Sequence, residues 1–411
     1  MNFEYFISKR LVTKSDDKSN ISAPIIKIAI AAIAIGIVMM FVAISTGFGL
    51  QNKIREKIAA FNGHIVINNF SNSQSNITER PINTKQDFYP HFEAVPAVEH
   101  IQKTATKYGI IRTATDFEGI VVKGVGEQYR WEYLEEYLVK GALPTFDKSI
   151  SREVLISNYL AKRLGFEVGD KLIVYFLRED QDRLPRSVGL SISGIFDSGF
   201  KEFDETYIIT DLKQIQRLNN WEADEIGQFE LFVDDFSGIT TIGAEVYGEV
   251  DSFLNASTIL ELYPTIFEWL KMFDFNIFLI IGIMILVAGI NMITALLVLI
   301  LERTQMIGLL KALGSTDWSI RKVFLYNAGF LIFRGLFWGN LIGISLLLIQ
   351  KYLKLIPLNP ETYYVSEAPI YLSWDYILIV NLGTLMLCVL MLLVPSVIIT
   401  KISPVKAMKF D

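Results

Sequence analysis

The pattern of apolar positions along the chain is dominated by four long runs with almost no charge. Residues 28–50, 275–301 and 376–400 contain no Asp, Glu, Lys or Arg, and residues 323–349 contain only Arg334. Each run is at least as long as the roughly 20 residues that an α-helix needs to cross about 30 Å of hydrocarbon. The pattern therefore predicts four transmembrane helices. The first run is also too long for the apolar part of a cleaved signal peptide.

The basic residues that flank these runs indicate how the helices are oriented. The N-terminal segment 1–27, the loop 302–322 and the tail 401–411 are rich in Lys and Arg, whereas the loop 350–375 holds only Lys351 and Lys354. Because short cytoplasmic segments carry the excess of basic residues, both termini and the loop 302–322 are expected to face the cytoplasm. The domain 51–274 and the loop 350–375 are then expected on the other side of the membrane.

The 224 residues 51–274 have the composition of a water-soluble domain. They carry 23 basic and 35 acidic residues, a net charge of −12, and the rest of the chain carries +6. This charge argues against nucleic-acid binding by the domain, because a basic surface is missing. Short runs rich in Val, Ile, Phe and Tyr predict strands, and helical apolar spacing predicts helices. The predicted strands are 64–68, 120–123, 154–157, 171–177, 190–195, 207–210 and 229–233, and the predicted helices are 158–164, 212–218 and 239–254.

The predicted fold class is thus an α-helical membrane domain of four transmembrane helices, with a large α+β extracytoplasmic domain inserted between helices 1 and 2. Residues 51–61 and 260–273 have helical spacing and are expected to continue the first two membrane helices outward as stalks. Gly335, Gly339 and Gly343 recur every four residues, which favours close packing of the third helix against a neighbour.

Few residues in the chain offer chemistry of their own. A single cysteine, Cys388, excludes a disulfide framework within the chain, and the three histidines are too scattered for a metal site. The chain has no glycine-rich P-loop that could bind nucleotide phosphates. No metal or cofactor is therefore expected on this chain, and the energy for any work across the membrane must come from another protein.

The loop between the second and third membrane helices carries the most informative pattern. Met306, Leu309, Leu310 and Leu313 recur at helical spacing, and Gly314 ends the run. The spacing predicts a short cytoplasmic helix with one apolar face. Such a helix either lies on the membrane surface or docks into a groove of a partner protein.

The sequence of this loop, ERTQMIGLLKALGST, resembles the signature that follows the second membrane helix in FtsX/MacB-type permeases of ABC transporters. It departs from that signature at Met306, where the family has an acidic residue. The tail PSVIITKISPVKAMKF resembles the closing motif of the same family. Lipoprotein-releasing permeases of the LolC/LolE type are the most similar branch, over segments such as FEYFISKRLV, ISTGFGLQNKI, EVLISNYLAKRLGFEVGDKLIVY and SISGIFDSGFKEFDETYII. The resemblance covers nearly the whole chain.

This resemblance implies a permease subunit of the bacterial inner membrane that is not itself an enzyme. Two copies of a separate cytosolic ATPase would bind ATP and Mg, and a second permease protomer, identical or a paralogue, would complete the transporter. Its substrates would be lipoproteins, taken from the membrane lipid by mechanotransmission and passed to a periplasmic carrier. The residues implied in ATPase coupling are Arg303, Gln305, Met306, Ile307, Gly308, Leu309, Leu310, Lys311, Ala312, Leu313 and Gly314.

An apolar path for the acyl chains is expected at the outer ends of the first two membrane helices. One side of it would be formed by Phe41, Phe48, Leu50 and Ile54, and the other by Phe267, Trp269, Met272, Phe273 and Phe278. The alternative is that these residues are ordinary lipid-facing side chains and interfacial aromatic residues.

The hairpin between 171–177 and 190–195 has a highly charged tip, REDQDRLPRSVG, in which Pro185 favours a protruding arm. In the LolC type the same interval forms a hook that captures the periplasmic carrier. The resemblance implies this role for Arg178, Arg183, Leu184, Pro185 and Arg186. The alternative is a solvated tip whose charges protect an edge strand.

Three further points stay open at the level of sequence. Arg334 is an intramembrane arginine, which by default marks a functional site, and Asn291 and backbone carbonyls are its candidate partners. The same family contains MacB-like efflux permeases and FtsX-like regulators of periplasmic hydrolases, and both are alternatives to lipoprotein release. A purely structural membrane anchor is disfavoured by the pattern of the loop 302–322.

Overall fold

A computed structural model describes residues 4–8, 22–71, 80–146, 149–176 and 185–402 of the chain. The described residues belong to two compact units. The membrane unit falls within residues 1–50, 270–357 and 367–411, and the sheet unit within residues 51–269 and 358–366.

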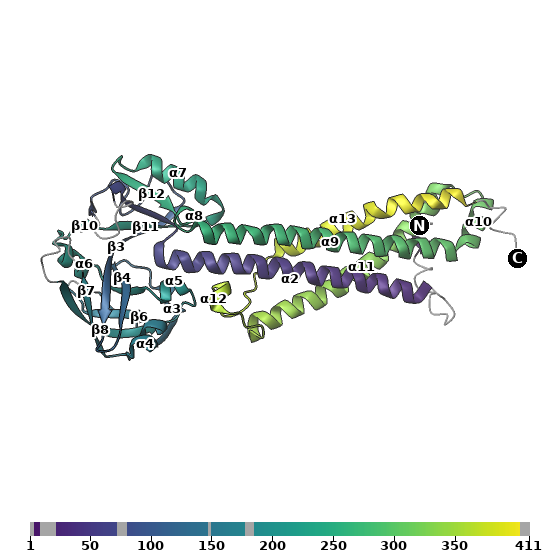
Figure 1. The fold of residues 1–411 in the computed structure, drawn as a ribbon. Helices are drawn as coiled ribbons and strands as arrows, with labels where there is room; N and C mark the ends of the chain where they lie inside the picture. Colours follow the sequence, from purple (N-terminus) through teal and green to yellow (C-terminus); the bar gives the residue numbers. More distant parts are fainter. Residues whose placement is uncertain (1–3, 9–21, 72–79, 147–148, 177–184, 403–411) are drawn as a thin grey trace. The chain divides into compact units, whose positions relative to one another are not determined.

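Four helices in the described part of the chain are, by length and composition, long and apolar enough to cross a membrane, and they contain the four predicted apolar runs, the fourth together with the 3₁₀ helix that follows it. They are α2 (Ser22–Asn62), α9 (Pro264–Glu302), α11 (Asp317–Leu353) and α13 (Trp374–Ser396) (Figure 1). The short helix α10 (Thr304–Ala312) joins α9 to α11, and the 3₁₀ helix η3 (Val397–Lys401) follows α13. Helices α2 and α9 are continuous beyond the apolar runs, as expected for stalks, although residues 259–262 form a separate helix, α8 (Ile259–Leu262).

Helix α11 packs closely against α2 through its glycines. A Cβ atom added at Gly335 would lie 2.7 Å from the Cβ atom of Ile33, and one added at Gly339 would lie 2.7 Å from that of Ile37. Gly343 continues the same face one turn further along. The four-residue repeat therefore allows two backbones to approach within one chain, as small residues do between membrane helices.

Gly339→Val is expected to destabilise the membrane unit by about 1–3 kcal/mol, because the added methyl groups would overpack the contact with Ile37. Thermal unfolding of the full chain in detergent would measure the change. Gly282→Val is the matched control, since a Cβ atom there meets nothing within 4 Å among the described residues. Equal melting temperatures for the two variants would show that the close contact has no energetic weight.

Polar side chains also join the membrane helices. The side-chain amides of Asn340 in α11 and Asn381 in α13 exchange two hydrogen bonds, of 2.6 and 2.9 Å. Because lipid offers no hydrogen-bonding partner, such a pair adds specificity to the packing of two helices.

The sheet unit is built on a ten-stranded sheet with the order β12-β1-β11-β3-β4-β9-β6-β8-β5, in which β7 pairs with β3 and β8. The strands are β1 (Ile65–Asn69), β3 (Val98–Arg112), β4 (Phe117–Val125), β5 (Leu138–Gly141), β6 (Glu153–Ser157), β7 (Lys171–Phe176), β8 (Arg186–Phe196), β9 (Tyr207–Asp211), β11 (Gln228–Val233) and β12 (Leu254–Thr258). Neighbouring strands are antiparallel except for the parallel pairs β4–β9 and β6–β8. A small second sheet pairs β2 (Ile82–Asn83) with β10 (Glu225–Ile226).

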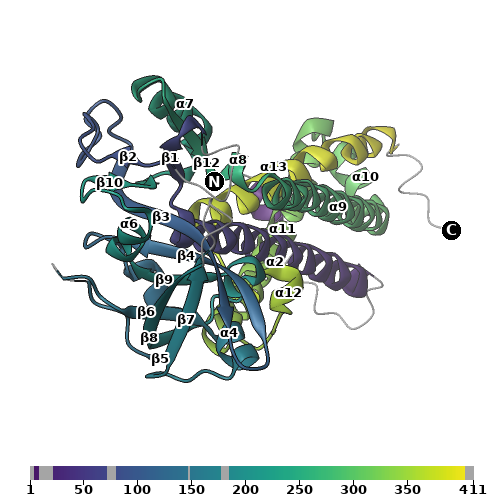
Figure 2. The same cartoon turned by 60° about the vertical axis from the view of Figure 1, so that its left-hand side comes forward.

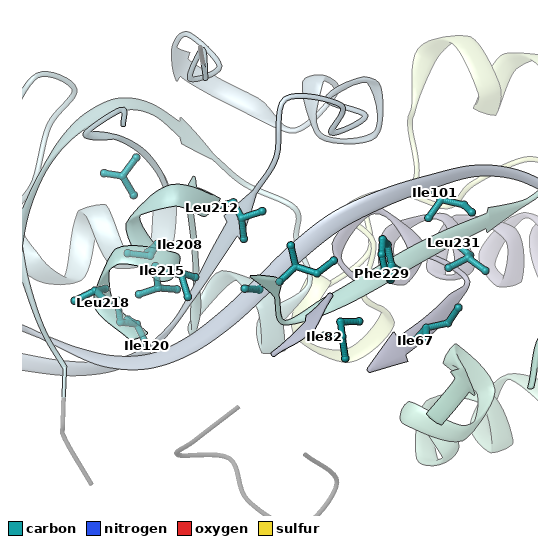
Figure 3. Packing of buried hydrophobic residues seen from close by; sticks show 14 of the residues in the cluster. Ile67, Ile82, Ile101, Ile120, Ile208, Leu212, Ile215, Leu218, Phe229 and Leu231 are labelled. Atoms are coloured by element: carbon teal, nitrogen blue, oxygen red, sulfur yellow. The ribbon is translucent and has the colours of Figure 1, made fainter. Parts of the chain in front are cut away.

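Short helices complete the predicted α+β unit. They are α3 (Glu132–Glu135), α4 (Asn158–Leu164), α5 (Lys201–Asp204), α6 (Leu212–Asn219), η2 (Phe236–Gly238), α7 (Ile239–Glu249), α8 and α12 (Pro360–Tyr363). Among them, α4, α6, α7 and α8 pack against strands of the sheets. Figure 2 shows α6 beside β3 and β4. Its apolar side chains, Leu212, Ile215 and Leu218, lie near Ile120 and Ile208 in the core (Figure 3).

Several elements differ from the sequence-based expectation, and the short elements β2, β5, β10, α3, α5 and α12 were not predicted. The helix predicted at 239–254 ends at Glu249, and residues 254–258 form the edge strand β12 instead. Strand β3, which is 15 residues long, was not predicted. Its inward positions include the polar side chains of Gln102 and Thr104, both buried, and these break the apolar alternation by which a strand is recognised.

Candidate functional site

Helix α10 is anchored to the end of the last membrane helix by one lysine. The Nζ atom of Lys311 donates hydrogen bonds to the carbonyl oxygens of Ile399 at 2.8 Å and Ile402 at 2.9 Å, and it lies 2.9 Å from the carboxylate of Asp317. A cation is favourable there because the carbonyls at a helix end carry partial negative charge. The anchor makes α10 part of the membrane unit.

The apolar side chains of α10 point in two directions, whereas the sequence suggested one apolar face. Ile307 is buried, and Leu310 packs against the core of the membrane unit together with Met306. Leu309 and Leu313 lie on the other side, with 54% and 75% of their surface exposed. The inner face therefore holds α10 in place, and the outer face presents two leucines.

The other residues of this segment lie on these two faces or at the ends of the helix. Gln305 and Ala312 are exposed, and Gly308 is buried. Arg303 precedes the helix, with its guanidinium 3.8 Å from the Glu302 carboxylate, and Gly314 follows the helix with a φ of +87°. The exposed surface formed by Gln305, Leu309, Ala312 and Leu313 is called the coupling face below.

An apolar cavity of about 290 Å³ lies between α2, α9 and α13 within the membrane unit. Two of the residues expected on an acyl-chain path, Phe48 and Phe278, line it. The ring of Phe48 stacks on Tyr376 of α13 at a centroid distance of 4.8 Å. The wall contributed by α13 was not predicted, and it consists of Tyr376, Ile379, Val380, Gly383 and Thr384.

Two small residues of α13 distinguish this cavity wall. A Cβ atom added at Gly383 would meet nothing within 4 Å among the described residues, so the backbone leaves open space there. The hydroxyl of Thr384 is buried and has no hydrogen-bond partner in the described part of the chain. A buried hydroxyl without a partner costs about 1–3 kcal/mol. The sequence signal that could have indicated this wall is the pair Gly383–Thr384, which interrupts a run of large apolar residues.

The remaining residues of the expected path are spread over both units. Within the membrane unit, Phe41 and Leu50 are buried, Phe273 is half-buried, and Met272 is 63% exposed. Within the sheet unit, Ile54 and Phe267 are buried and Trp269 is half-buried. Phe267 stacks on Phe236 at 6.1 Å between ring centroids. The structure thus brings only Phe48 and Phe278 of the nine into the cavity.

A buried ion pair, missed at the level of sequence, lies in the middle of the ten-stranded sheet. The Nζ atom of Lys123 in β4 lies 2.6 Å from Glu230 in β11, and both side chains are fully buried. The carboxylate of Glu230 also accepts hydrogen bonds from Gln102 at 2.8 Å, Thr104 at 3.0 Å and Gln228 at 3.0 Å. Burial lowers the pKa of Lys123 from its usual value, and the neighbouring Glu230 carboxylate opposes that shift.

This ion pair holds the end of α2 to the sheet. Lys123 donates a hydrogen bond to the carbonyl of Phe61 in the last turn of α2, and the Tyr129 hydroxyl donates to the carbonyl of Ala60 at 3.1 Å. The next residue of the helix, Asn62, donates to the hydroxyl of Tyr263 at 2.6 Å, just before α9 begins. Within the sheet unit, α2 therefore ends in a fixed joint, which also contacts the residue that leads into α9.

The expected carrier-binding hairpin is described only in part. Arg178, Arg183 and Leu184 lie outside the described residues. Pro185 is exposed, and Arg186 opens β8. The guanidinium of Arg186 donates hydrogen bonds to the carbonyl of Leu218 and, at 3.2 Å, to the side chain of Asn220, at the end of α6. Arg186 thus has a structural role as a helix cap.

Arg334 lies on an exposed side of α11, next to the exposed Phe333. Its guanidinium makes no hydrogen bond or ion pair within the described ranges of the chain, so it contacts neither of its candidate partners there, Asn291 or a backbone carbonyl.

Two protein families match the sequence. The family described as "MacB-like periplasmic core domain" matches residues 28–247, and the family described as "FtsX-like permease C-terminal" matches residues 278–404. The first match begins within α2 and ends within α7, and the second covers most of α9 together with α10, α11 and α13.

Two relatives align with this chain over most of both sequences. The "Lipoprotein-releasing system transmembrane protein LolE" of Haemophilus influenzae is 21% identical, and the alignment covers 99% of each chain. The "Lipoprotein-releasing system transmembrane protein LolC" of Xylella fastidiosa (strain Temecula1) is 20% identical over 93% of each chain. Among solved structures, the periplasmic region of MacB from Actinobacillus actinomycetemcomitans is 13% identical and covers 49% of this chain and 91% of its own, with a TM-score of 0.32.

Proposed function

Since the chain belongs to the family of FtsX-like permeases with a MacB-like periplasmic core domain, we propose that it is the membrane subunit of an ABC transporter that releases lipoproteins from the bacterial inner membrane. The observation that supports lipoproteins as the substrate is the match to lipoprotein-releasing relatives. It extends over 93–99% of the chain, through both the sheet unit and the membrane helices. Neither half of the chain alone would separate this function from that of other permeases in the family.

The topology follows from the basic flanks of the four helices. Both termini and α10 face the cytoplasm, and the sheet unit is inserted between α2 and α9 on the periplasmic side. Because the sequence has no P-loop, ATP and Mg bind to a separate cytosolic ATPase. Two copies of this ATPase belong to the transporter. A second permease protomer completes the transporter, and a periplasmic carrier receives the lipoprotein.

The coupling face of α10 is the surface for the ATPase. Leu309 and Leu313 are exposed on a helix whose opposite side is fixed by Lys311 and Ile307. A rigidly held helix with exposed leucines is suited to lie in a partner's apolar groove. Movement of the ATPase would then be transmitted to the membrane helices, and through the joint at Phe61 to the sheet unit.

The cavity between α2, α9 and α13 is the place for an acyl chain of the substrate. Each buried CH₂ group costs about 0.8 kcal/mol to expose to water, so one acyl chain costs of the order of 10 kcal/mol. Extraction therefore needs both ATP and apolar surface along the route. The lining by Phe48, Ile277 and Phe278 supplies such a surface within the membrane unit.

Filling the cavity tests this proposal. Gly383→Leu is expected to lower ATP-dependent lipoprotein release by about 5-fold to 150-fold, because a clash with a bound chain costs about 1–3 kcal/mol and each 1.4 kcal/mol is a factor of about ten. The open space at Gly383 allows the larger side chain without disturbing the fold. Release from proteoliposomes that contain the full chain, its ATPase and a purified carrier would be measured.

Gly282→Leu is the matched control for this experiment. It makes the same substitution in a membrane helix where a Cβ atom also meets nothing within 4 Å among the described residues, but it is not among the residues that line the cavity. Both variants should assemble with the ATPase. Equal release by the two variants would show that the cavity is not on the substrate's route.

A further inference from the structure

A second hollow lies at the other end of the membrane unit, along α11. It has a volume of about 650 Å³, within the range of about 300–1,000 Å³ that is typical of small-molecule sites. Helix α11 lines it at positions 318, 322, 325, 326, 329, 330 and 333, which fall on one face of the helix. Tyr5 of the short helix at residues 4–8 and Val389 of α13 close its sides. It is called the α11 groove below.

The α11 groove matches one leaflet of a membrane in depth. Lys322 is the last charged residue before the apolar run 323–349, so it lies at the membrane surface. Phe333 lies 11 residues further along the helix, which at 1.5 Å per residue is about 16 Å. Half of the hydrocarbon thickness is about 15 Å. The groove therefore runs from the headgroup level to the middle of the bilayer.

Its walls change from polar to apolar along this depth. At the surface, the ring of Trp318 has the Arg321 guanidinium carbon 5.4 Å and the Lys322 ammonium 5.9 Å from its centroid. Deeper, the lining is aromatic, and Tyr5 packs on Phe330 at 5.9 Å between ring centroids. Tryptophan and lysine at headgroup level above an apolar groove are complementary to an amphipathic molecule that lies along the membrane normal.

The charge at the surface end indicates the headgroup. The side chain of Lys322 is 41% exposed, and its one ion pair in the described chain, with Glu4, has a long distance of 3.9 Å. The carboxylate of Glu4 accepts a hydrogen bond of 2.8 Å from the Ser319 hydroxyl. The Lys322 ammonium therefore keeps donors for a further anion, and lysine near a membrane surface attracts anionic lipid headgroups.

We propose that the α11 groove binds one membrane phospholipid with an anionic headgroup, its phosphate at Lys322 and one acyl chain along the aromatic wall as far as Phe333. Gly329 leaves room for the chain, because a Cβ atom there meets nothing within 4 Å among the described residues. The bound lipid joins the helix at residues 4–8 to α11 and α13. It lies on a different part of the membrane unit from the cavity between α2, α9 and α13.

The full chain reconstituted in phosphatidylcholine vesicles tests this site. Brominated phosphatidylglycerol or brominated phosphatidylcholine is added, and the quenching of Trp318 is taken as the difference between the native chain and Trp318→Phe. We expect Trp318 to prefer phosphatidylglycerol about fivefold, the effect of about one well-placed lysine contact. Equal quenching by the two lipids would overturn the proposal.

Three variants separate a built site from general surface attraction. Lys322→Gln should remove the preference, whereas Lys351→Gln, an exposed lysine at the other end of α11, should keep it. Gly329→Leu should also remove it, because the side chain fills the groove while Lys322 remains. A preference that survives Lys322→Gln or Gly329→Leu would overturn the proposal. The measurement uses neither ATPase nor lipoprotein, so its outcome is independent of the proposed transport function.

Discussion

Leu309→Asp is expected to weaken binding of the ATPase about a hundredfold or more and to abolish ATP-dependent release. The side chain lies on the coupling face and is 54% exposed, so the carboxylate is harmless to the isolated permease. In the complex it would be buried in an apolar groove without a partner, which costs several kcal/mol, and each 1.4 kcal/mol is a factor of about ten. Titration of the purified full chain with the ATPase would measure the affinity.

Leu355, in the loop after α11, and Leu310, on the inner face of α10, supply the controls for that experiment. Leu355→Asp introduces the same charge at a leucine that is 64% exposed in the loop after α11, outside the coupling face, and should bind the ATPase normally. Leu310→Asp should instead reduce the amount of folded permease, because Leu310 packs against the membrane unit's own core. Normal affinity and normal release in Leu309→Asp would show that the coupling face does not bind the ATPase.

Lys123→Met is expected to destabilise the sheet unit by about 3–5 kcal/mol, because it leaves the fully buried carboxylate of Glu230 without its cation. The substitution also removes the hydrogen bond to the carbonyl of Phe61, so the end of α2 is released from the sheet. Urea unfolding of the full chain in detergent, followed by limited proteolysis of the region 51–269, would measure the loss.

A double variant distinguishes the buried charge from the loss of packing. Lys123→Met with Glu230→Gln removes the charge but keeps a side-chain oxygen for Gln102 and Thr104. It should recover more than half of the lost stability, since the unpaired charge is the dominant cost. If Lys123→Met alone lowers the free energy of unfolding by less than about 1 kcal/mol, Glu230 takes up a proton or finds another partner. The ion pair would then not be the main contact that holds the end of α2 to the sheet.

The parts of the fold that depend on long apolar periodicity were predicted from the sequence. The four membrane helices were placed by their uncharged runs, and α4 and α6 were found by helical spacing within one residue of their bounds. Strand β3 was missed because its buried positions hold Gln102 and Thr104, which serve the carboxylate of Glu230. A polar residue that is buried for the sake of a distant partner gives no local signal.

The candidate sites show the same limit. The segment around Leu309 was recognised from its motif, but its division into an anchored face and an exposed face depends on the contact of Lys311 with Ile399, 88 positions away. The cavity was expected between the first two membrane helices, and its third wall, with Gly383 and Thr384, comes from α13. Pairs of helices that are distant in sequence meet only in the folded unit, and no local pattern predicts which faces they share.

The central claim, that this chain releases lipoproteins from the inner membrane, is tested most directly by depleting it in its own cells. Newly made lipoproteins are pulse-labelled, and the inner and outer membranes are then separated. We predict that lipoproteins destined for the outer membrane accumulate in the inner membrane as the chain is lost, and that the native chain, but not Leu309→Asp, restores their transfer. Normal arrival of these lipoproteins in the outer membrane after depletion would contradict the proposed function.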